Sequence, residues 1–413
     1  MRTFILSTLF LGIYIILDII LNELMWESNT KLTIYLQNKE FKGEQEIMTF
    51  FSNWLNIFPG IALLVFMFKE NKLGAILYGC MIMFIISFNS LLKNIYHQPR
   101  PFWTEEDIKG LQCNKEFGKP SGHAMQSSLM CFLLPCILFP AIWRDQENLK
   151  YPKLLRVIII TIIIIWTLIT GFSRIFFGAH TYGQVLLGWI YSGYIMINYM
   201  TYIHERLLNY FKTCLVTGGP GIGRRVIYIS ILVTFIWSMI SYLFYRLNSN
   251  EILINNAEIQ LWLDAMLRKC TSQINPYKFK SASVLQNNCF NNSFQILFIF
   301  FILLGTKLCG GTYDESKFSQ NFAKLKWKLK LYRVVLLLVL LLIVEPFVFF
   351  IVTEHLSAVI FFQTIPICFF GGFVLTYFYP KALFHLGLNI EGDFLNSENR
   401  IITTKIHANA NEV

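Results

Sequence analysis

Three short clusters in the sequence combine basic side chains and histidines at spacings that suit chemistry on an anionic group. The first cluster holds Lys93 and Arg100, which lie seven residues, about two helical turns, apart. Pro99 and Pro101 flank Arg100 and would fix the chain that carries it. Taken alone, this cluster is better explained as the basic end of a membrane helix, with its long side chains reaching towards water.

The second cluster is the tetrapeptide Pro120-Ser121-Gly122-His123 at the start of an apolar run. Ser121 is a favourable N-cap, and Gly122 lets the backbone approach a ligand closely. The free N–H groups of a helix start suit an anion, and His123 would stand beside it. A capped helix start with an interfacial histidine is the simpler alternative.

The third cluster contains Ser173, Arg174, His180 and Gln184, and it follows another apolar run. The guanidinium of Arg174 matches the geometry of phosphate oxygens. Gln184 lies one helical turn after His180, so its amide oxygen could accept a hydrogen bond from the histidine ring. The alternative here is an arginine at a membrane surface and an interfacial histidine.

The elements that must position these clusters are membrane helices. Hydrophobic residues make up 55% of the 413-residue chain and charged residues only 15%, which excludes a disordered chain and argues against a soluble enzyme. The formal net charge is +10, but the charges are scattered between apolar runs, so we expect no nucleic-acid partner. We predict an all-α, polytopic helical bundle with about ten spans. They cover about 4–24, 48–68, 73–92, 122–142, 154–172, 185–203, 226–245, 293–310, 334–352 and 357–379.

This topology predicts that the three clusters meet on one side of the membrane. The third span leads to the first cluster, the fourth starts from the second cluster, and the fifth leads to the third. Lys and Arg are more frequent in the loops on the side of the termini, so we expect cytosolic termini and a lumenal site. The endoplasmic reticulum fits this arrangement, and the plasma membrane remains an alternative.

Such a site fits phosphoryl transfer. A phosphoryl transition state spreads charge over its oxygens, so fixed cations can supply much of the stabilisation without a metal. Two histidines can divide the roles of nucleophile and acid. We therefore expect an enzyme of phosphoryl transfer, without cofactor or metal.

The pattern formed by Lys93 with Arg100-Pro101, by Pro120 to His123 and by Ser173-Arg174 with His180 resembles the type 2 phosphatidic acid phosphatase (PAP2) superfamily, which includes vanadium haloperoxidases. The resemblance implies a helical bundle with its core in the membrane. It implies that His180 forms a phosphohistidine and that His123 protonates the leaving alkoxide. It also implies that the phosphate is bound by Lys93, Arg100, Ser121, Gly122 and Arg174.

The substrate stays open between two branches of this superfamily. Most members carry Asp where Gln184 stands, whereas the glucose-6-phosphatase branch resembles this chain in using Gln and in Pro120 to Met125. Sphingoid-base phosphate phosphatases resemble it in length, in span number and in Pro99-Arg100-Pro101. The balance favours a lipid phosphate, either a sphingoid-base phosphate or phosphatidate. A sugar phosphatase is the alternative, and a catalytically silent lipid-binding or scaffold protein is a weaker one.

We divide the chain into four parts: an N-terminal anchor span and lumenal loop (1–47), a PAP2-like catalytic core (48–205), additional spans with a lumenal loop at 246–292 (206–380), and a cytosolic tail (381–413). In the lumenal loop, Cys270 and Cys289 could form a disulfide in an oxidising compartment, with free thiols as the alternative. Asn291 begins a glycosylation sequon close to the next span.

Overall fold

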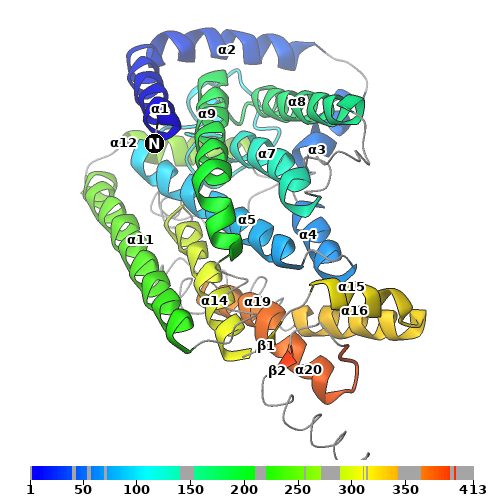
Figure 1. Ribbon diagram of the computed structural model, residues 1–413. Coiled ribbons are helices and arrows are strands. Elements are labelled where there is room, and N and C mark those ends of the chain that lie inside the picture. Colours follow the sequence, from blue (N-terminus) through cyan, green and yellow to red (C-terminus); the bar gives the residue numbers. More distant parts are fainter. Residues whose placement is uncertain are drawn as a thin grey trace, which may run out of the picture.

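The computed structural model describes residues 2–39, 43–53, 57–68, 72–139, 153–209, 220–254, 257–270, 289–309, 311–312, 315–342, 364–390 and 395–396. Almost all of these residues are helical, which confirms the predicted all-α bundle (Figure 1). The only strands in the described part are β1 (Gly311–Thr312) and β2 (Leu395–Asn396), which form a short antiparallel pair.

Up to residue 254, the α-helices that the structure describes include two that continue into a π-helical turn. The α-helices of this part are α1 (Arg2–Ile20), α2 (Asn22–Asn38), α3 (Glu44–Asn53), α4 (Ile57–Phe68), α5 (Lys72–Tyr96), α6 (Pro101–Thr104), α7 (Gly122–Leu133) with Leu134–Leu138, α8 (Lys153–Phe176), α9 (Tyr182–Asn198) with Tyr199–Ile203, and α11 (Pro220–Ile254).

The described helices after residue 254 lie before β1 and between β1 and β2 in the chain. They are α12 (Ala257–Lys269), a 3₁₀ turn (Phe294–Ile296) leading into α14 (Leu297–Cys309), α15 (Glu315–Lys324), α16 (Trp327–Leu342), α19 (Ile365–Phe373) with a π-helical turn (Val374–Phe378), and α20 (Tyr379–His385).

Seven of the ten predicted spans coincide with helical segments long and apolar enough to cross a membrane. These segments are Arg2–Ile20, Gln45–Phe66, Lys72–Thr104, Lys153–Phe176, Ile227–Leu247, Cys289–Cys309 and Ile365–His385. In hydrocarbon a helix satisfies its own backbone hydrogen bonds, which is why apolar runs of this length fold as helices. The predicted spans at 122–142 and 185–203 correspond to the shorter helices α7 and α9 with their π-helical turns, and the one at 334–352 runs into residues outside the described part.

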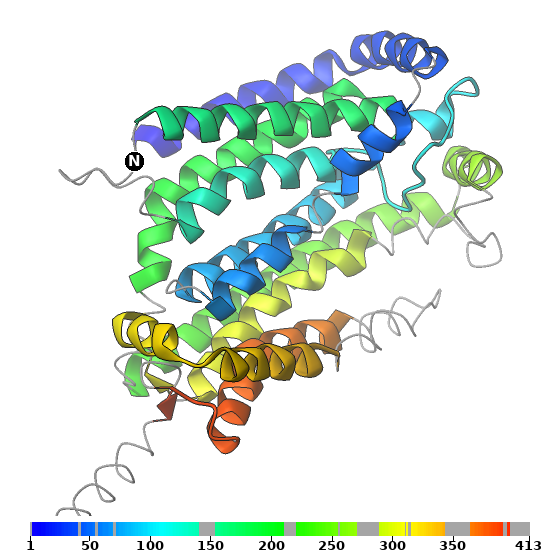
Figure 2. The same cartoon turned by 90° about the vertical axis from the view of Figure 1, so that its right-hand side faces the viewer.

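Helix α5 lies at the centre of the bundle and is buried along most of its length. It packs against α4, α7 and α11, and α7 packs in turn against α8 and α9. By contrast, α1, α8 and α11 expose rows of large apolar side chains, as helices facing lipid would. Figure 2 shows α1 and α8 on one side of the bundle and α11 on the other, with the N-terminus at one end.

Helix α2 crosses the opposite end of the bundle, a region predicted only as a loop (Figures 1 and 2). Its buried face is polar, and three amide side chains bind parts of the chain on which it lies. Asn29 accepts from the backbone N–H of Tyr182 at 2.7 Å, and Gln37 donates to the carbonyl of Phe176 at 2.9 Å. Asn22 accepts from Gln98 at 2.5 Å. The helix therefore fastens the end of α5 and the turn between α8 and α9.

Candidate active site

The three sequence clusters meet at this same end of the bundle around a cavity of about 470 Å³. Five predicted site residues line it directly: Lys93, Arg100, Gly122, His123 and His180. The other three, Ser121, Arg174 and Gln184, are buried and are not among its lining residues. The remaining lining residues are Ile86, Asn89, Ser90, Cys113, Asn114, Lys115, Glu116, Gln126, Asn292 and Gln295.

His180 stands in the turn between α8 and α9, just after Gly178, whose φ of +66° requires a residue without a side chain. Its Nε2 lies 3.0 Å from Nη1 of Arg100. An arginine can only donate, so Nε2 is the unprotonated nitrogen of the ring. Its Nδ1 lies 2.8 Å from the carbonyl oxygen of Gly118, which can only accept, so Nδ1 carries the proton. The lone pair of His180 is therefore on Nε2.

Gly118 is a positioning residue that the sequence analysis missed. A Cβ at this position would lie 2.5 Å from the carbonyl oxygen of Pro99 and 2.8 Å from the amide of Gln184. Its own N–H donates to the carbonyl of Gln98 at 2.8 Å. Only a glycine lets this loop come close enough for its carbonyl to hold His180.

Gln184 has a wider role than the predicted contact with His180. Its Oε1 lies 3.2 Å from Nδ1 of His180, farther than the Gly118 oxygen does. Its Nε2 donates to Gln98 Oε1 at 3.0 Å and to the Pro99 carbonyl at 2.9 Å. Gln184 also closes a capping box with Thr181 at the start of α9. The amide thus ties the turn that carries His180 to the end of α5.

Arg174 is fully buried at the end of α8. Its Nη1 donates to Ser52 of α3 at 2.7 Å and to Gln112. Among the described residues, its Nε and Nη2 have no hydrogen-bond partner, and neither does the hydroxyl of Ser121. Buried donors without partners are costly, and an anion would satisfy them.

Arg100 is bound by the protein itself rather than left free for a ligand. It donates to the carbonyl oxygens of Glu116 at 2.7 Å, Phe117 at 3.3 Å and Ala179 at 3.0 Å. The seven-residue spacing would place Arg100 two turns after Lys93 on one helix, but α5 ends at Tyr96. Arg100 still reaches the same cavity as Lys93, because the chain turns back after α5.

Lys93 forms an ion pair with Glu116, whose Oε2 lies 2.5 Å from its Nζ. The other oxygen of Glu116 accepts from Nδ2 of Asn292 at 2.5 Å. Burial alone would raise the pKa of Glu116, but Lys93, Arg100 and Asn292 together hold it below its usual value. The sequence offered no local signal for either Glu116 or Asn292, because each is apart from the three clusters.

The surroundings of His180 also disfavour its protonation. Burial is the largest cause, and four positive or ionisable neighbours add to it. They are Arg100, Arg174, Lys93 and His123. Together they lower the pKa of His180 well below its usual value of about 6.5. A neutral imidazole with an unprotonated Nε2 can act as a nucleophile.

The predicted Cys270–Cys289 disulfide is wrong. Cys270 at the end of α12 is bonded to Cys113 of the loop that lines the cavity, while Cys289 is a buried free thiol. The reason is packing: α12 lies against α6, which brings Cys270 within 6.0 Å of Cys113 between Cα atoms. Asn291 lies at the start of the segment leading to α14, and its Oδ1 accepts from Thr364. Its glycosylation stays a prediction.

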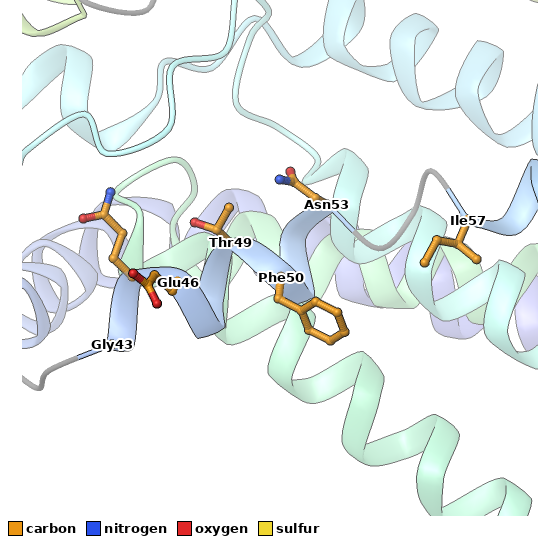
Figure 3. A pocket seen from close by; sticks show the side chains of 7 residues that line it. Gly43, Glu46, Thr49, Phe50, Asn53 and Ile57 are labelled. Carbon is orange, nitrogen blue, oxygen red and sulfur yellow. The ribbon is translucent and has the colours of Figure 1, made fainter.

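A second, larger cavity of about 860 Å³ lies along α3 and the beginning of α4 (Figure 3). Its lining is Gly43, Gln45, Glu46, Thr49, Phe50, Asn53 and Ile57. Its described lining residues include no histidine and no basic side chain, in contrast to the smaller cavity.

Residues 74–208 match the family model of the PAP2 superfamily. This segment runs from α5 past the π-helical turn that follows α9 and contains all three sequence clusters, so the resemblance to the superfamily is confirmed there. No curated protein and no solved structure gives a significant match. The match supports a phosphatase-type function, and the long apolar helices support an integral membrane protein.

Proposed function

We propose that the protein is an integral-membrane phosphomonoesterase that works through a phosphohistidine on His180. One observation carries the proposal: the lone pair of His180 is on Nε2, at the wall of a cavity that also holds Lys93, Arg100 and His123. A nucleophile, fixed cations and a second histidine are the parts that such a reaction requires.

In the first step, Nε2 of His180 attacks the phosphorus atom while the bond from phosphorus to the alcohol oxygen breaks. His123, as an imidazolium beside the bound phosphate, gives its proton to the leaving alkoxide and becomes neutral. In the second step, water attacks the phosphohistidine, His123 takes up a proton from that water, and the P–N bond breaks to release inorganic phosphate. Nδ1–H of His180 stays on the Gly118 carbonyl throughout, which supports the positive charge that develops on the ring.

The phosphate oxygens would be bound by the groups still available at the site. The Nε and Nη2 of Arg174 and the hydroxyl of Ser121 are buried donors without partners in the described part of the chain. The N–H groups at the start of α7, near Gly122, add the positive end of a helix dipole. Lys93 lines the cavity and would contribute its ammonium, which it shares with Glu116.

The lining of the cavity favours a sugar phosphate over a lipid phosphate as the substrate. Apart from Ile86 and Cys113, every residue around it is polar, charged or glycine. A lipid tail needs apolar surface, whereas amides such as Asn89 and Gln126 can exchange hydrogen bonds with hydroxyl groups. We therefore propose a phosphate ester of a hydrophilic alcohol, such as a sugar phosphate, and keep lipid phosphate as the alternative. The proposed location of the site is the lumen of the endoplasmic reticulum.

The test is phosphate release by the purified full chain in detergent with EDTA present. Glucose 6-phosphate, sphingosine 1-phosphate and phosphatidate are compared, with His180→Ala as the blank. Release from glucose 6-phosphate alone is expected. Release from a lipid alone would return the substrate to the lipid branch, and no release from any phosphate ester would favour a silent binding protein.

A further inference from the structure

Glu116 stands out within the cavity because it is a carboxylate in a site that otherwise gathers cations. Its Oε2 lies 2.5 Å from Nζ of Lys93, a predicted phosphate ligand. A phosphate entering the cavity would meet a cation that is already paired. The arrangement is therefore not explained by phosphate binding alone, for which a carboxylate is a competitor.

The carboxylate is held in place from outside the PAP2-like segment. Its second oxygen accepts from Nδ2 of Asn292 at 2.5 Å, and Oδ1 of Asn292 accepts from Gln295 at 3.3 Å. Both amides belong to the segment that leads into α14, beyond residues 74–208. The additional spans thus supply one wall of the cavity and fix its only carboxylate among the lining residues.

The backbone of Glu116 is also part of the site. Its carbonyl oxygen accepts from Nε of Arg100 at 2.7 Å, and Arg100 in turn contacts Nε2 of His180. The disulfide at Cys113 holds the same loop three residues earlier. The disulfide and the bond from Arg100 hold the backbone of this loop, while Lys93 and Asn292 hold the carboxylate of Glu116.

We propose that Glu116 is a positioning residue that acts through Lys93, and that Asn292 holds it there. In the empty site its negative charge orients the Lys93 ammonium and offsets part of the positive charge of the cavity. When a phosphate binds, it must share Lys93 with Glu116, so free phosphate binds less tightly than it would to an unpaired Lys93. This weakens the hold on the inorganic phosphate product and favours its release. The effect on product release rests on the proposed function. The effect on phosphate binding can be measured without turnover.

Removing the charge of Glu116 is therefore expected to tighten the binding of a free anion. In Glu116→Gln, the dissociation constant of inorganic phosphate, measured by calorimetry on the detergent-purified full chain, should fall about tenfold or more. In turnover, product inhibition by phosphate should strengthen by a similar factor. Glu116→Asp keeps the charge and should restore a dissociation constant within about threefold of the original.

Two controls separate this role from a structural one. Glu106→Gln removes a carboxylate from the same loop, but Glu106 is exposed and does not line the cavity, so phosphate binding should not change. Asn292→Ala should tighten phosphate binding in the original chain and have no further effect in Glu116→Gln, because the amide acts only through the carboxylate.

Unchanged or weaker phosphate binding in a folded Glu116→Gln protein would overturn the inference. An equal effect of Glu106→Gln would also overturn it, because the change would then reflect net charge alone. Failure of the proposed function has a different signature, namely turnover that survives His180→Ala. A protein that shows the binding change but no turnover would retain the inference about charge and lose the proposed function.

Discussion

A carboxylate oxygen of Asp18 lies 2.5 Å from the ammonium of Lys119, and both side chains are buried. The pair joins α1, which lies outside the PAP2-like segment, to the residue that precedes Pro120 and Ser121. Lys119 also lies over the ring of Tyr96 at 5.3 Å. The N-terminal helix is therefore a structural part of the site and not only an anchor.

Breaking this pair should destabilise the protein. Asp18→Asn leaves Lys119 buried without its counter-ion, which costs roughly 3–5 kcal/mol, and the unfolding temperature in detergent should fall clearly. Replacing both residues, by Asp18→Leu with Lys119→Met, should cost less than the single change, since no buried charge remains. As a control, Glu27→Gln removes an exposed ion pair with Lys31 and should change stability little. Equal effects of Asp18→Asn and Glu27→Gln would contradict this account.

Gly118→Ala should inactivate the enzyme without unfolding it. The added Cβ would lie 2.5 Å from the Pro99 carbonyl, so the loop must move and withdraw its oxygen from Nδ1 of His180. A displacement of about 1 Å at a reacting group can cost roughly 100-fold, and we expect a fall in kcat of at least that size. Gly79→Ala provides a control within α5, because its Cβ would meet nothing within 4 Å. Near-normal turnover by Gly118→Ala would show that the carbonyl does not position the nucleophile.

Gln184→Asp should keep partial activity. The shorter acidic side chain loses the two bonds that Nε2 donates to Gln98 and Pro99, but the Gly118 carbonyl still holds His180. Because His180 keeps its main hydrogen bond, we expect kcat to fall by roughly tenfold, which corresponds to about 1.4 kcal/mol. Steady-state rates beside those of His180→Ala provide the measurement. A variant as inactive as His180→Ala would mean that Gln184, and not Gly118, is the main support of the ring.

The pH profile should reflect a nucleophile that resists protonation. Burial and nearby cations lower the pKa of His180 below about 6.5, so the reactive neutral form persists to lower pH than for an exposed histidine. The sign follows from the lowered pKa: acid inactivation through His180 begins only below pH of about 6.5. The acid limb of kcat/KM for a soluble phosphate ester is the quantity to measure. A limb centred above 6.5 and assigned to His180 would be inconsistent with this environment.

The sequence predicted the parts of the site that are local in the chain. Lys93, Gly122, His123 and His180 all reach one cavity, because apolar runs of the right length bring the ends of successive helices to the same side. Arg174 and Ser121 were also predicted as phosphate ligands. Both are buried, and Nε and Nη2 of Arg174 and the hydroxyl of Ser121 have no hydrogen-bond partner among the described residues. Residue type, the order of the clusters and the number of spans were sufficient to predict that these residues meet at one site.

The sequence could not predict the contacts between distant segments. Glu116 meets Asn292 only because the segment before α14 packs beside α5, and no pattern near either residue indicates it. The disulfide partner of Cys270 depends in the same way on α12 lying over α6. Helix α2 was missed because its buried face is polar, so it carries no apolar period that would mark it as packed.

The most direct test of the central claim is to trap the phosphorylated enzyme. The purified chain is mixed with ³²P-labelled substrate in EDTA, quenched in alkali to preserve phosphohistidine, and the labelled peptide is identified. We predict label on the peptide that contains His180, and none in His180→Ala, which should remain folded but lose turnover. Label at another residue, or full turnover by His180→Ala, would contradict the phosphohistidine mechanism.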